Sequence, residues 1–179
     1  MKQIPLTGKR GEGKFALVDD HHYEKLSKYS WNCNGFGYAI TNLYDENKNR
    51  SMILMHNMIF PDKEGLELDH KDRNRLNNTE ENVRYVTRSQ NNMNRSKGEK
   101  KKYLSKYKGV TYLPTRKVNL KDGSFHFIER KQPWTGQIAL GEKRYSKKCY
   151  TEVEAAEFYN EKARELFGEF ANLNIITNP

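Results

Sequence analysis

The chain has 179 residues, a net charge of +9, a pI near 9.4 and a mean hydropathy of −1.02. That length holds one ordinary domain or two small ones, and no run approaches the roughly 18 apolar residues of a membrane span. Two cysteines cannot build a cysteine-based zinc site or a disulfide framework, and the N-terminus lacks the apolar core of a signal peptide, so we expect an intracellular, cytoplasmic protein with no membrane partner.

The N-terminal part of the chain predicts several short elements rather than a few long ones. Apolar spacing and turn residues indicate, in chain order, a strand over 14–18, a helix over 21–29, a hairpin from 35–42 and 51–55 with a polar tip at 45–50, and a short helix over 56–60. Asp19 or Asp20 precedes the first helix, and its carboxylate is expected to accept hydrogen bonds from the free N–H groups of the first turn.

The following segment has a distinctive order of elements. Residues 66–70 and 83–87 alternate apolar and polar side chains, which predicts two half-buried strands, and a long asparagine-rich loop joins them. Thr87 with Gln90 three residues later predicts a capping box at the start of a helix over 88–95. The predicted order is therefore strand, loop, strand, helix.

Three polar side chains in this segment can act together. Neighbouring residues of a strand point to opposite faces, so Asp69 and His70 are not expected to bind the same ion. Asp69 and Asn91 offer oxygen ligands for Mg²⁺ or Mn²⁺, and His70 is then left to activate water. A cation and a base are the minimum set for cleaving a phosphodiester. By spacing alone, an Asp-His pair beside an asparagine-rich loop is more often a turn with side-chain caps.

A basic segment divides the chain. Residues 96–106 are charged, contain Gly98 and have few apolar anchors, so they are expected to form a linker. Residues 95–150 carry 16 basic and 4 acidic side chains, whereas residues 1–94 carry 14 and 13. Such a block favours a polyanionic partner, because each Lys or Arg placed on a phosphate releases condensed counterions. A merely solvated basic surface remains an alternative from charge alone.

The C-terminal part predicts a small antiparallel sheet covered by one amphipathic helix. Its strands are expected at 107–113, 125–128, 134–140 and 144–149. Thr151 and Glu154 form a second capping box, and the helix that it opens ends at Gly168, a plausible C-terminal glycine. The fold class of the whole chain is therefore α+β.

The strand–loop–strand–helix segment resembles the ββα-metal motif of HNH endonucleases, most closely the phage and intron-borne homing type. The resemblance rests on Asp69-His70-Lys71-Asp72-Arg73-Asn74, Asn77-Asn78, Glu81-Asn82-Val83-Arg84-Tyr85-Val86-Thr87 and Gln90-Asn91. It implies that His70 is the general base and that Asp69 and Asn91 hold the divalent metal, Mg²⁺ or Mn²⁺. It further implies that Asn82 belongs to the catalytic set, fixes the loop and orients His70 by a hydrogen bond. The upstream His56 is interpreted as structural.

The C-terminal part has a resemblance of its own. Tyr107-Lys108-Gly109-Val110, Trp134-Thr135-Gly136-Gln137-Ile138 and Glu154-Ala155-Ala156-Glu157-Phe158-Tyr159-Asn160 resemble an Apetala-type (ethylene-response-factor) DNA-binding domain. This implies three antiparallel strands in the major groove, backed by a helix, although residues 116–133 are an insertion. One sheet face is expected to bind DNA through Lys106, Lys108, Tyr112, Trp134, Gln137, Lys143 and Arg144. Trp134 could instead belong to the core.

These expectations describe a metal-dependent DNA endonuclease of the homing type, encoded by a phage or mobile element and acting on double-stranded DNA in the host cell. Residues 1–95 are the HNH nuclease domain with its ββα core near 65–95, and residues 107–174 are the DNA-binding domain. A monomer is favoured, because no heptad seam suggests a dimer. The main alternative is a DNA-binding regulator that does not cleave. An RNA-binding protein fits the basic charge but lacks the paired aromatic residues of an RNA-recognition strand.

Overall fold

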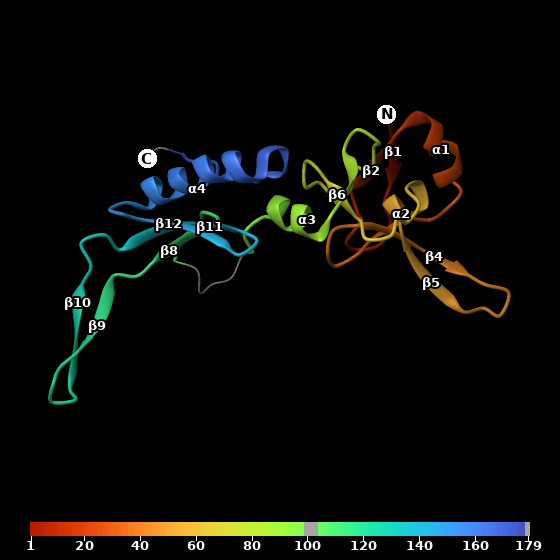
Figure 1. The fold of residues 1–179 in the computed structure, drawn as a ribbon. Helices are drawn as coiled ribbons and strands as arrows, with labels where there is room; N and C mark the ends of the chain where they lie inside the picture. Colours follow the sequence, from red (N-terminus) through yellow and green to blue (C-terminus); the bar gives the residue numbers. More distant parts are fainter. Residues whose placement is uncertain (99–103, 178–179) are drawn as a thin grey trace. The chain divides into compact units, whose positions relative to one another are not determined.

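The computed structural model describes residues 1–98 and 104–177, and the chain divides into two compact units, Met1–Asn92 and Met93–Pro179. Figure 1 shows helices combined with small, separate antiparallel sheets, so the predicted α+β class is consistent with the structure. Within the described part of the chain, no helix is long and apolar enough to cross a bilayer.

The first unit contains short strands and helices that run on into the start of the second. In chain order they are β1 (Lys2–Pro5), β2 (Phe15–Val18), α1 (Asp20–Leu26), β3 (Asn32–Cys33), β4 (Ala39–Tyr44), β5 (Arg50–Leu54), α2 (Met55–Ile59), β6 (Glu67–His70), β7 (Val83–Val86) and α3 (Arg88–Asn94). The expected strand, helices and hairpin are confirmed, with α1 ending earlier than predicted. The strands β1 and β3 were not predicted, because each places only one side chain in the core.

The core of the first unit forms around Trp31 and Leu26. Both side chains are almost fully buried, and the Trp31 indole N–H donates to the carbonyl of Leu26 at 2.8 Å. Val18 and Met55 belong to the same apolar cluster, so β2, α1 and α2 share one core. Burying large side chains in this way stabilises the unit by roughly 1.5–3 kcal/mol for each residue.

The expected cap at the start of α1 is wrong in its detail. Asp19 occupies the N-cap position with an extended backbone, but its side chain makes no capping hydrogen bond. The carboxylate of Asp19 instead accepts from the backbone N–H of Glu80 at 2.7 Å, in the loop between β6 and β7. A second strand–loop contact lies beside it, since the Asn78 N–H donates to the carbonyl of Leu17. The N-terminal segment therefore holds that loop in place.

The second unit contains a three-stranded sheet and one long helix. Its elements are β8 (Val110–Tyr112), β9 (Thr115–Asn119), β10 (Phe125–Glu129), β11 (Trp134–Leu140), β12 (Lys143–Cys149), α4 (Glu152–Phe167) and the 3-10 turn η1 (Gly168–Phe170). The sheet order is β12-β11-β8, and all of its strand pairs are antiparallel. The predicted capping box of α4 is confirmed, because the Glu154 N–H donates to Thr151 Oγ1 at 3.1 Å.

The helix α4 can lie close to the sheet because glycine occurs at two contact points. A Cβ on Gly136 would lie 2.4 Å from the carbonyl oxygen of Ala155, and a Cβ on Gly109 would lie 2.1 Å from the ring of Tyr159. Gly109 also has φ +72°, a conformation that side chains with a Cβ rarely adopt. The core of this unit, including Ile138, therefore lies between β11 and α4.

The insertion at 116–133 forms a hairpin of its own. Strands β9 and β10 pair with each other and extend away from the sheet of their unit (Figure 1). Only one strand was predicted there, because the sequence of β9 contains a single apolar residue, Val118.

The predicted linker, residues 96–106, is only partly covered, because residues 99–103 lie outside the described residues. On either side of them the chain is attached to the second unit. The Lys97 ammonium donates to the carbonyls of Ser105 and Tyr107 at 2.8 and 2.7 Å. The described ends of the segment are therefore anchored, which the charged composition did not suggest.

Candidate functional site

The hairpin β6–β7 and the helix α3 place the predicted ligand Asp69. In the register of the hairpin, Asp69 lies opposite Arg84 and His70 lies opposite Val83. The Arg84 Nε donates to Asp69 Oδ2 at 3.1 Å, and only 7% of Asp69 is exposed. Solvent screens the attraction in a buried ion pair less than in a surface pair. The positive charge of Arg84 therefore balances the negative charge of the Asp69 carboxylate in this structure.

The predicted ligand Asn91 reaches the same strand but a different residue. Its side-chain Nδ2 donates to Glu67 Oε2 at 2.7 Å. Glu67 and Asp69 are two residues apart on β6, so they share one face of the hairpin. The face thus offers two carboxylates and a carboxamide, the hard oxygen donors that suit a divalent cation such as Mg²⁺.

His70 lies on the opposite side of the strand from Asp69, as the alternation of a strand requires. Its ring is 5% exposed and lies near the rings of His56 and Tyr38, with centroids 5.1 and 5.9 Å away. The His70 Nε2 lies 3.4 Å from Asn78 Oδ1. Burial lowers the pKa of His70, and the contact with Asn78 raises it less than burial lowers it. The imidazole is therefore neutral at pH 7, the form that can accept a proton.

His56, interpreted as structural, forms part of the wall around His70. It is 6% exposed, and burial, followed by the nearby His70, lowers its pKa to about 4. Two imidazoles in contact disfavour each other's charged form, which helps to keep both neutral.

Asn82 holds the loop rather than the histidine. Its Oδ1 accepts from the Asp72 N–H at 3.0 Å, and its Nδ2 donates to the Asn77 carbonyl at 2.8 Å. The expected loop-fixing bonds are present, but the carboxamide next to His70 is that of Asn78. The physical reason is position: Asn78 lies in the same loop, and its side chain is fully buried and also reaches Met55 Sδ.

The expected single DNA-binding face of the C-terminal sheet is wrong for the two aromatic residues. Tyr112 lies opposite Trp134, and both share the face of Gly136, which packs on α4. Their rings lie 4.4 Å apart between centroids, and Trp134 packs against the buried cluster. Gln137, one position along from Gly136, points to the opposite face. Trp134 therefore packs against the core, as the alternative interpretation expected, because burying its apolar ring stabilises the unit.

Two other members of the expected set also have defined positions. The Lys108 ammonium donates to the carbonyls of Met93 and Arg95 at 2.7 Å each, near the end of α3. Cations are favourable at helix C-termini, so Lys108 has a structural contact. Arg144 lies opposite Ala139 on the face of Gln137, exposed and away from α4.

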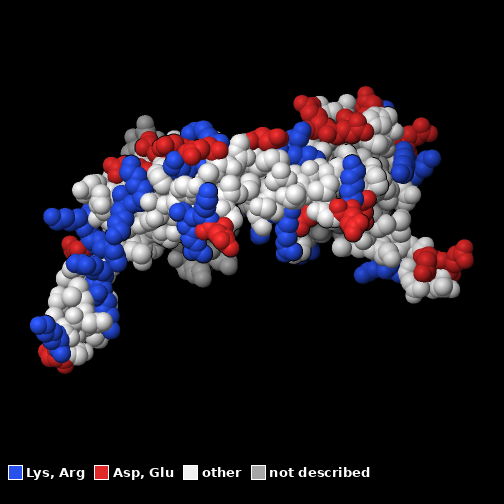
Figure 2. All heavy atoms as spheres, in the orientation of Figure 1, with Lys and Arg blue, Asp and Glu red and all other residues white. Residues whose placement is uncertain are grey.

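The remaining basic residues of the set, Lys106 and Lys143, are exposed. Figure 2 shows basic side chains concentrated over the β9–β10 hairpin and the adjoining part of its unit, with acidic ones along α4. The hairpin adds Arg116 and Lys117 and two exposed aromatic residues, Phe125 and Phe127. The Lys117 ammonium lies 3.9 Å from the centre of the Phe125 ring. Cationic and planar groups are thus side by side on this hairpin.

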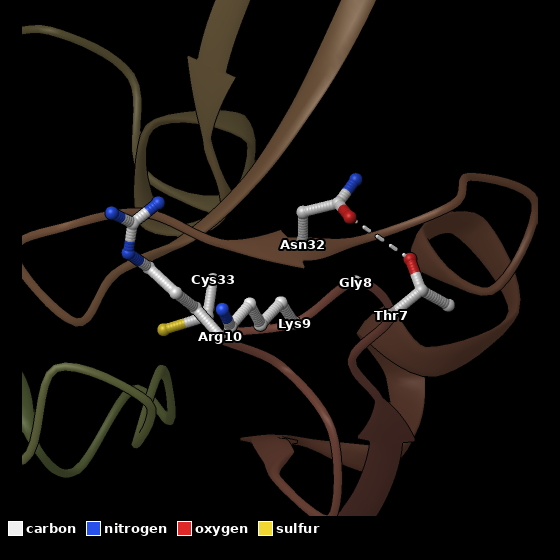
Figure 3. Close-up of a pocket in the computed structure, with 6 residues that line it drawn as sticks. All are labelled: Thr7, Gly8, Lys9, Arg10, Asn32 and Cys33. Atoms are coloured by element: carbon white, nitrogen blue, oxygen red, sulfur yellow. Dashed lines mark hydrogen bonds between the residues drawn. The ribbon is translucent and has the colours of Figure 1, made fainter.

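A separate cavity of about 460 Å³ in the first unit contains none of the predicted site residues (Figure 3). Lys9 and Arg10 line it, together with Cys33, and Thr7 Oγ1 donates to Asn32 Oδ1 at 3.1 Å across one side. It does not contribute to the hairpin site described above.

Comparison with known proteins assigns the family. Residues 60–93, which contain β6, β7 and most of α3, match the family model described as HNH endonuclease. The chain is also 34% identical over 169 residues to an uncharacterized HNH endonuclease of Acanthamoeba polyphaga mimivirus, covering 93% of this chain and 78% of that protein. No solved structure gives a significant match. The chain therefore belongs to the HNH endonuclease family and is a nuclease, a hydrolase. Nucleases of this family act on DNA and generally use a divalent metal ion.

Sequence reasoning gave no role to three residues that contact the predicted set. Glu67 and Arg84 bind Asn91 and Asp69, and Asn78 binds His70. The period-two pattern of β6 could have indicated Glu67, because it shares a face with Asp69. Arg84 and Asn78 follow from strand register and loop conformation, which the sequence does not specify.

Proposed function

We propose that the protein is a metal-dependent DNA endonuclease of the homing type that hydrolyses phosphodiester bonds in duplex DNA. The observation that carries this proposal is the division of roles across β6. A neutral, buried His70 lies on one side of the strand, and the oxygen-rich set of Asp69, Glu67 and Asn91 lies on the other. The viral relative supports a viral or mobile-element source.

Asp69 and Asn91 are the residues that would hold the divalent cation, and Glu67 is close enough to Asn91 to assist. Bound there, Mg²⁺ or Mn²⁺ would supply Lewis-acid stabilisation of the scissile phosphate and the leaving oxygen. Asp69 must exchange its contact with Arg84 for this role, or share its oxygens between the two cations.

His70 is assigned as the general base that takes a proton from the attacking water. Its neutral ring is suited to this, and the Asn78 carboxamide beside Nε2 limits its rotation. Asn82 is assigned to the loop, where its two hydrogen bonds hold the backbone at Asp72 and at Asn77, the residue directly before Asn78. Asn82 is therefore a positioning residue, which acts on the reaction through the shape of the loop.

The C-terminal unit is proposed to bind the duplex through the sheet face opposite α4. Gln137 and Arg144 lie on that face, and Lys106 is exposed, whereas Lys143 pairs with Leu140 and therefore belongs to the face of Gly136. The resemblance to Apetala-type domains supports the use of such a face for major-groove contacts. A basic surface here is also consistent with the 16 basic side chains among residues 95–150.

The direct test is incubation of the protein with supercoiled plasmid in Mg²⁺ and, separately, in EDTA. Nicked or linear DNA that forms only with the metal supports the proposal. Equal cleavage in EDTA would contradict the metal dependence, and binding with no product under any divalent metal would contradict the nuclease.

A second candidate function is a DNA-binding regulator that does not cleave. The specific observation in its favour is the Arg84–Asp69 ion pair, which engages the proposed metal ligand. Replacing Arg84 with Gln distinguishes the two: a nuclease should keep metal-dependent cleavage, whereas a regulator shows none in either form.

A further inference from the structure

A cluster of metal-ligand side chains lies outside the proposed nuclease site. His21 and His22 on α1 meet Glu80 in the loop between β6 and β7, about sixty positions later in the chain. Their ligand atoms all lie within 4.8 Å of one another. Among residues 1–98 and 104–177, this is the single group of three or more His, Cys, Asp or Glu side chains with that geometry.

Both imidazoles point at the same carboxylate oxygen. The Nε2 atoms of His21 and His22 lie 3.0 and 3.1 Å from Oε1 of Glu80. Successive residues of a helix project about 100° apart, so two adjacent side chains do not normally converge. Here the two rings lie 4.0 Å apart between centroids and tilt toward one another.

Hydrogen bonds of the backbone also hold the three side chains close together. Asp19, which directly precedes α1, accepts from the N–H of Glu80 at 2.7 Å. The Leu17 N–H donates to the carbonyl of Leu76 at 2.8 Å, and Leu17 accepts from Asn78 at 2.9 Å. The start of α1 and the loop are thus tied together immediately beside the cluster, and the ligand atoms meet at a fixed place.

We propose that His21, His22 and Glu80 bind a transition-metal ion such as Zn²⁺. Imidazole nitrogen and carboxylate oxygen coordinate Zn²⁺ at roughly 2.0–2.2 Å, which places tetrahedral ligand atoms about 3.3 Å from one another. The two nitrogen–oxygen distances of 3.0 and 3.1 Å are close to this value, and the ligand atoms, which all lie within 4.8 Å of one another, reach it by small rotations of the side chains. A water molecule completes the four ligands.

The two sites differ in the metal that they select. The proposed nuclease site offers only oxygen donors from Asp69, Glu67 and Asn91, which suit Mg²⁺ or Mn²⁺. Two imidazole nitrogens favour Zn²⁺ and similar ions over Mg²⁺, so an excess of Mg²⁺ should not displace the ion from His21 and His22. The zinc site does not rest on the proposed function, because its ligands take no part in the hydrolysis.

The bound ion would fasten α1 to the loop that carries Asn78 and Asn82. Binding to the folded state alone stabilises a protein in proportion to the logarithm of the free ion concentration over its Kd. The first unit should therefore unfold at a higher temperature when Zn²⁺ is present, and the loop bonds beside His70 should open less often.

The test uses the full chain after chelator treatment, in buffer with excess Mg²⁺ and without DNA. We expect saturable binding of Zn²⁺ by calorimetric titration and a rise in Tm on adding Zn²⁺. His22→Ala and Glu80→Gln should each weaken Zn²⁺ binding by roughly 10-fold or more. Losing a residue that only hydrogen-bonds to a metal ligand typically costs about 10- to 100-fold in affinity, and losing the ligand itself should cost no less. The side chain of Glu80 is more than half exposed and that of His22 is 22% exposed, so circular dichroism and the Tm without Zn²⁺ must show that both variants stay folded.

Two controls separate this site from other histidines. His126→Ala on the exposed hairpin and His70→Ala in the proposed nuclease site should both keep the affinity for Zn²⁺. Absence of saturable binding by the intact protein, or unchanged binding by His22→Ala and Glu80→Gln, would overturn the site and leave only hydrogen bonds between the three side chains. Loss of binding in His70→Ala alone would assign the ion to the nuclease centre instead.

Discussion

His70 and His56 are a pair of buried imidazoles, and desolvation accounts for the state of both. Each pKa is lowered chiefly by burial, so both rings are neutral at pH 7. For His70 this is the form that a general base needs. For His56 the same effect has a thermodynamic consequence, since an imidazole that is neutral in the folded protein gains its proton more readily after unfolding.

Replacing His70 with Ala should lower the rate of DNA cleavage by roughly 10²–10⁴-fold, the usual contribution of a general base. Binding of Mn²⁺ to the hairpin should persist, because Asp69 and Asn91 lie on the other face of β6. Single-turnover cleavage of plasmid measures the first effect, and a Mn²⁺ titration measures the second. Asp69→Ala should lose both, and full activity of the His70→Ala protein would refute the assignment.

The lowered pKa of His56 predicts how the stability of the protein depends on pH. The pKa of His56 is about 4 in the folded protein against 6.5 in the unfolded chain. Protonating His56 would therefore lower the free energy of unfolding by on the order of 3 kcal/mol. The unfolded state binds more protons between these values, so the free energy of unfolding should fall as the pH drops from 6.5 toward 4. Urea denaturation across this range should show a shallower fall for His56→Gln than for the unmodified protein. An identical pH dependence of the two proteins would contradict the buried, neutral His56.

At the scale of elements, the two faces of the sheet β12-β11-β8 have different tasks. The face with Gly136 packs on α4, and the face with Gln137 and Arg144 is exposed. Strand alternation separates them, and the contact with the helix decides which is which.

Substitutions on the two faces should therefore affect different properties. Arg144→Gln should weaken duplex binding and reduce the salt slope by about one, while leaving Tm unchanged. Trp134→Ala should lower the free energy of unfolding by about 2 kcal/mol or more, because it removes a ring packed between β8 and α4. Fluorescence anisotropy with a DNA duplex and chemical denaturation measure the two effects. Stability loss in Arg144→Gln without an affinity loss would reverse the assignment of the faces.

At the scale of the whole molecule, positive charge is concentrated in one block of the chain. Residues 95–150 carry 16 basic against 4 acidic side chains, residues 1–94 carry 14 against 13, and residues 151–179 carry 2 against 6. The residues proposed for catalysis belong to the nearly neutral part. Affinity for DNA and the chemistry of cleavage are therefore expected to be separable.

A chain ended after residue 98 should keep its fold and lose most of its affinity for duplex DNA. The intact protein should show log Kd rising steeply with log salt, by roughly 0.9 for each phosphate neutralised, and the short chain should show a much shallower slope. Binding isotherms at several salt concentrations test this, with circular dichroism as the control for folding. Equal affinity and slope in the two proteins would show that the basic block is only a solvated surface.

The sequence alone was sufficient for the elements whose signals are local. Period-two alternation identified β6 and β7, and the Thr87–Gln90 and Thr151–Glu154 pairs identified the starts of α3 and α4. Both caps are present, with the Thr87 N–H donating to Gln90 Oε1 at 2.9 Å. Alternation also required Asp69 and His70 to point apart, because it depends on the backbone of one strand only.

Tertiary structure decided everything that depends on contacts between distant segments. Register placed Arg84 on Asp69, loop conformation placed Asn78 rather than Asn82 beside His70, and packing against α4 turned Trp134 inward. The folded chain also brings the loop between β6 and β7 to the start of α1. Asp19 therefore binds the Glu80 N–H instead of capping the helix, and the Glu80 side chain reaches His21 and His22. A polar side chain takes the partner that the folded backbone brings nearest, and a single sequence carries no direct record of that distance.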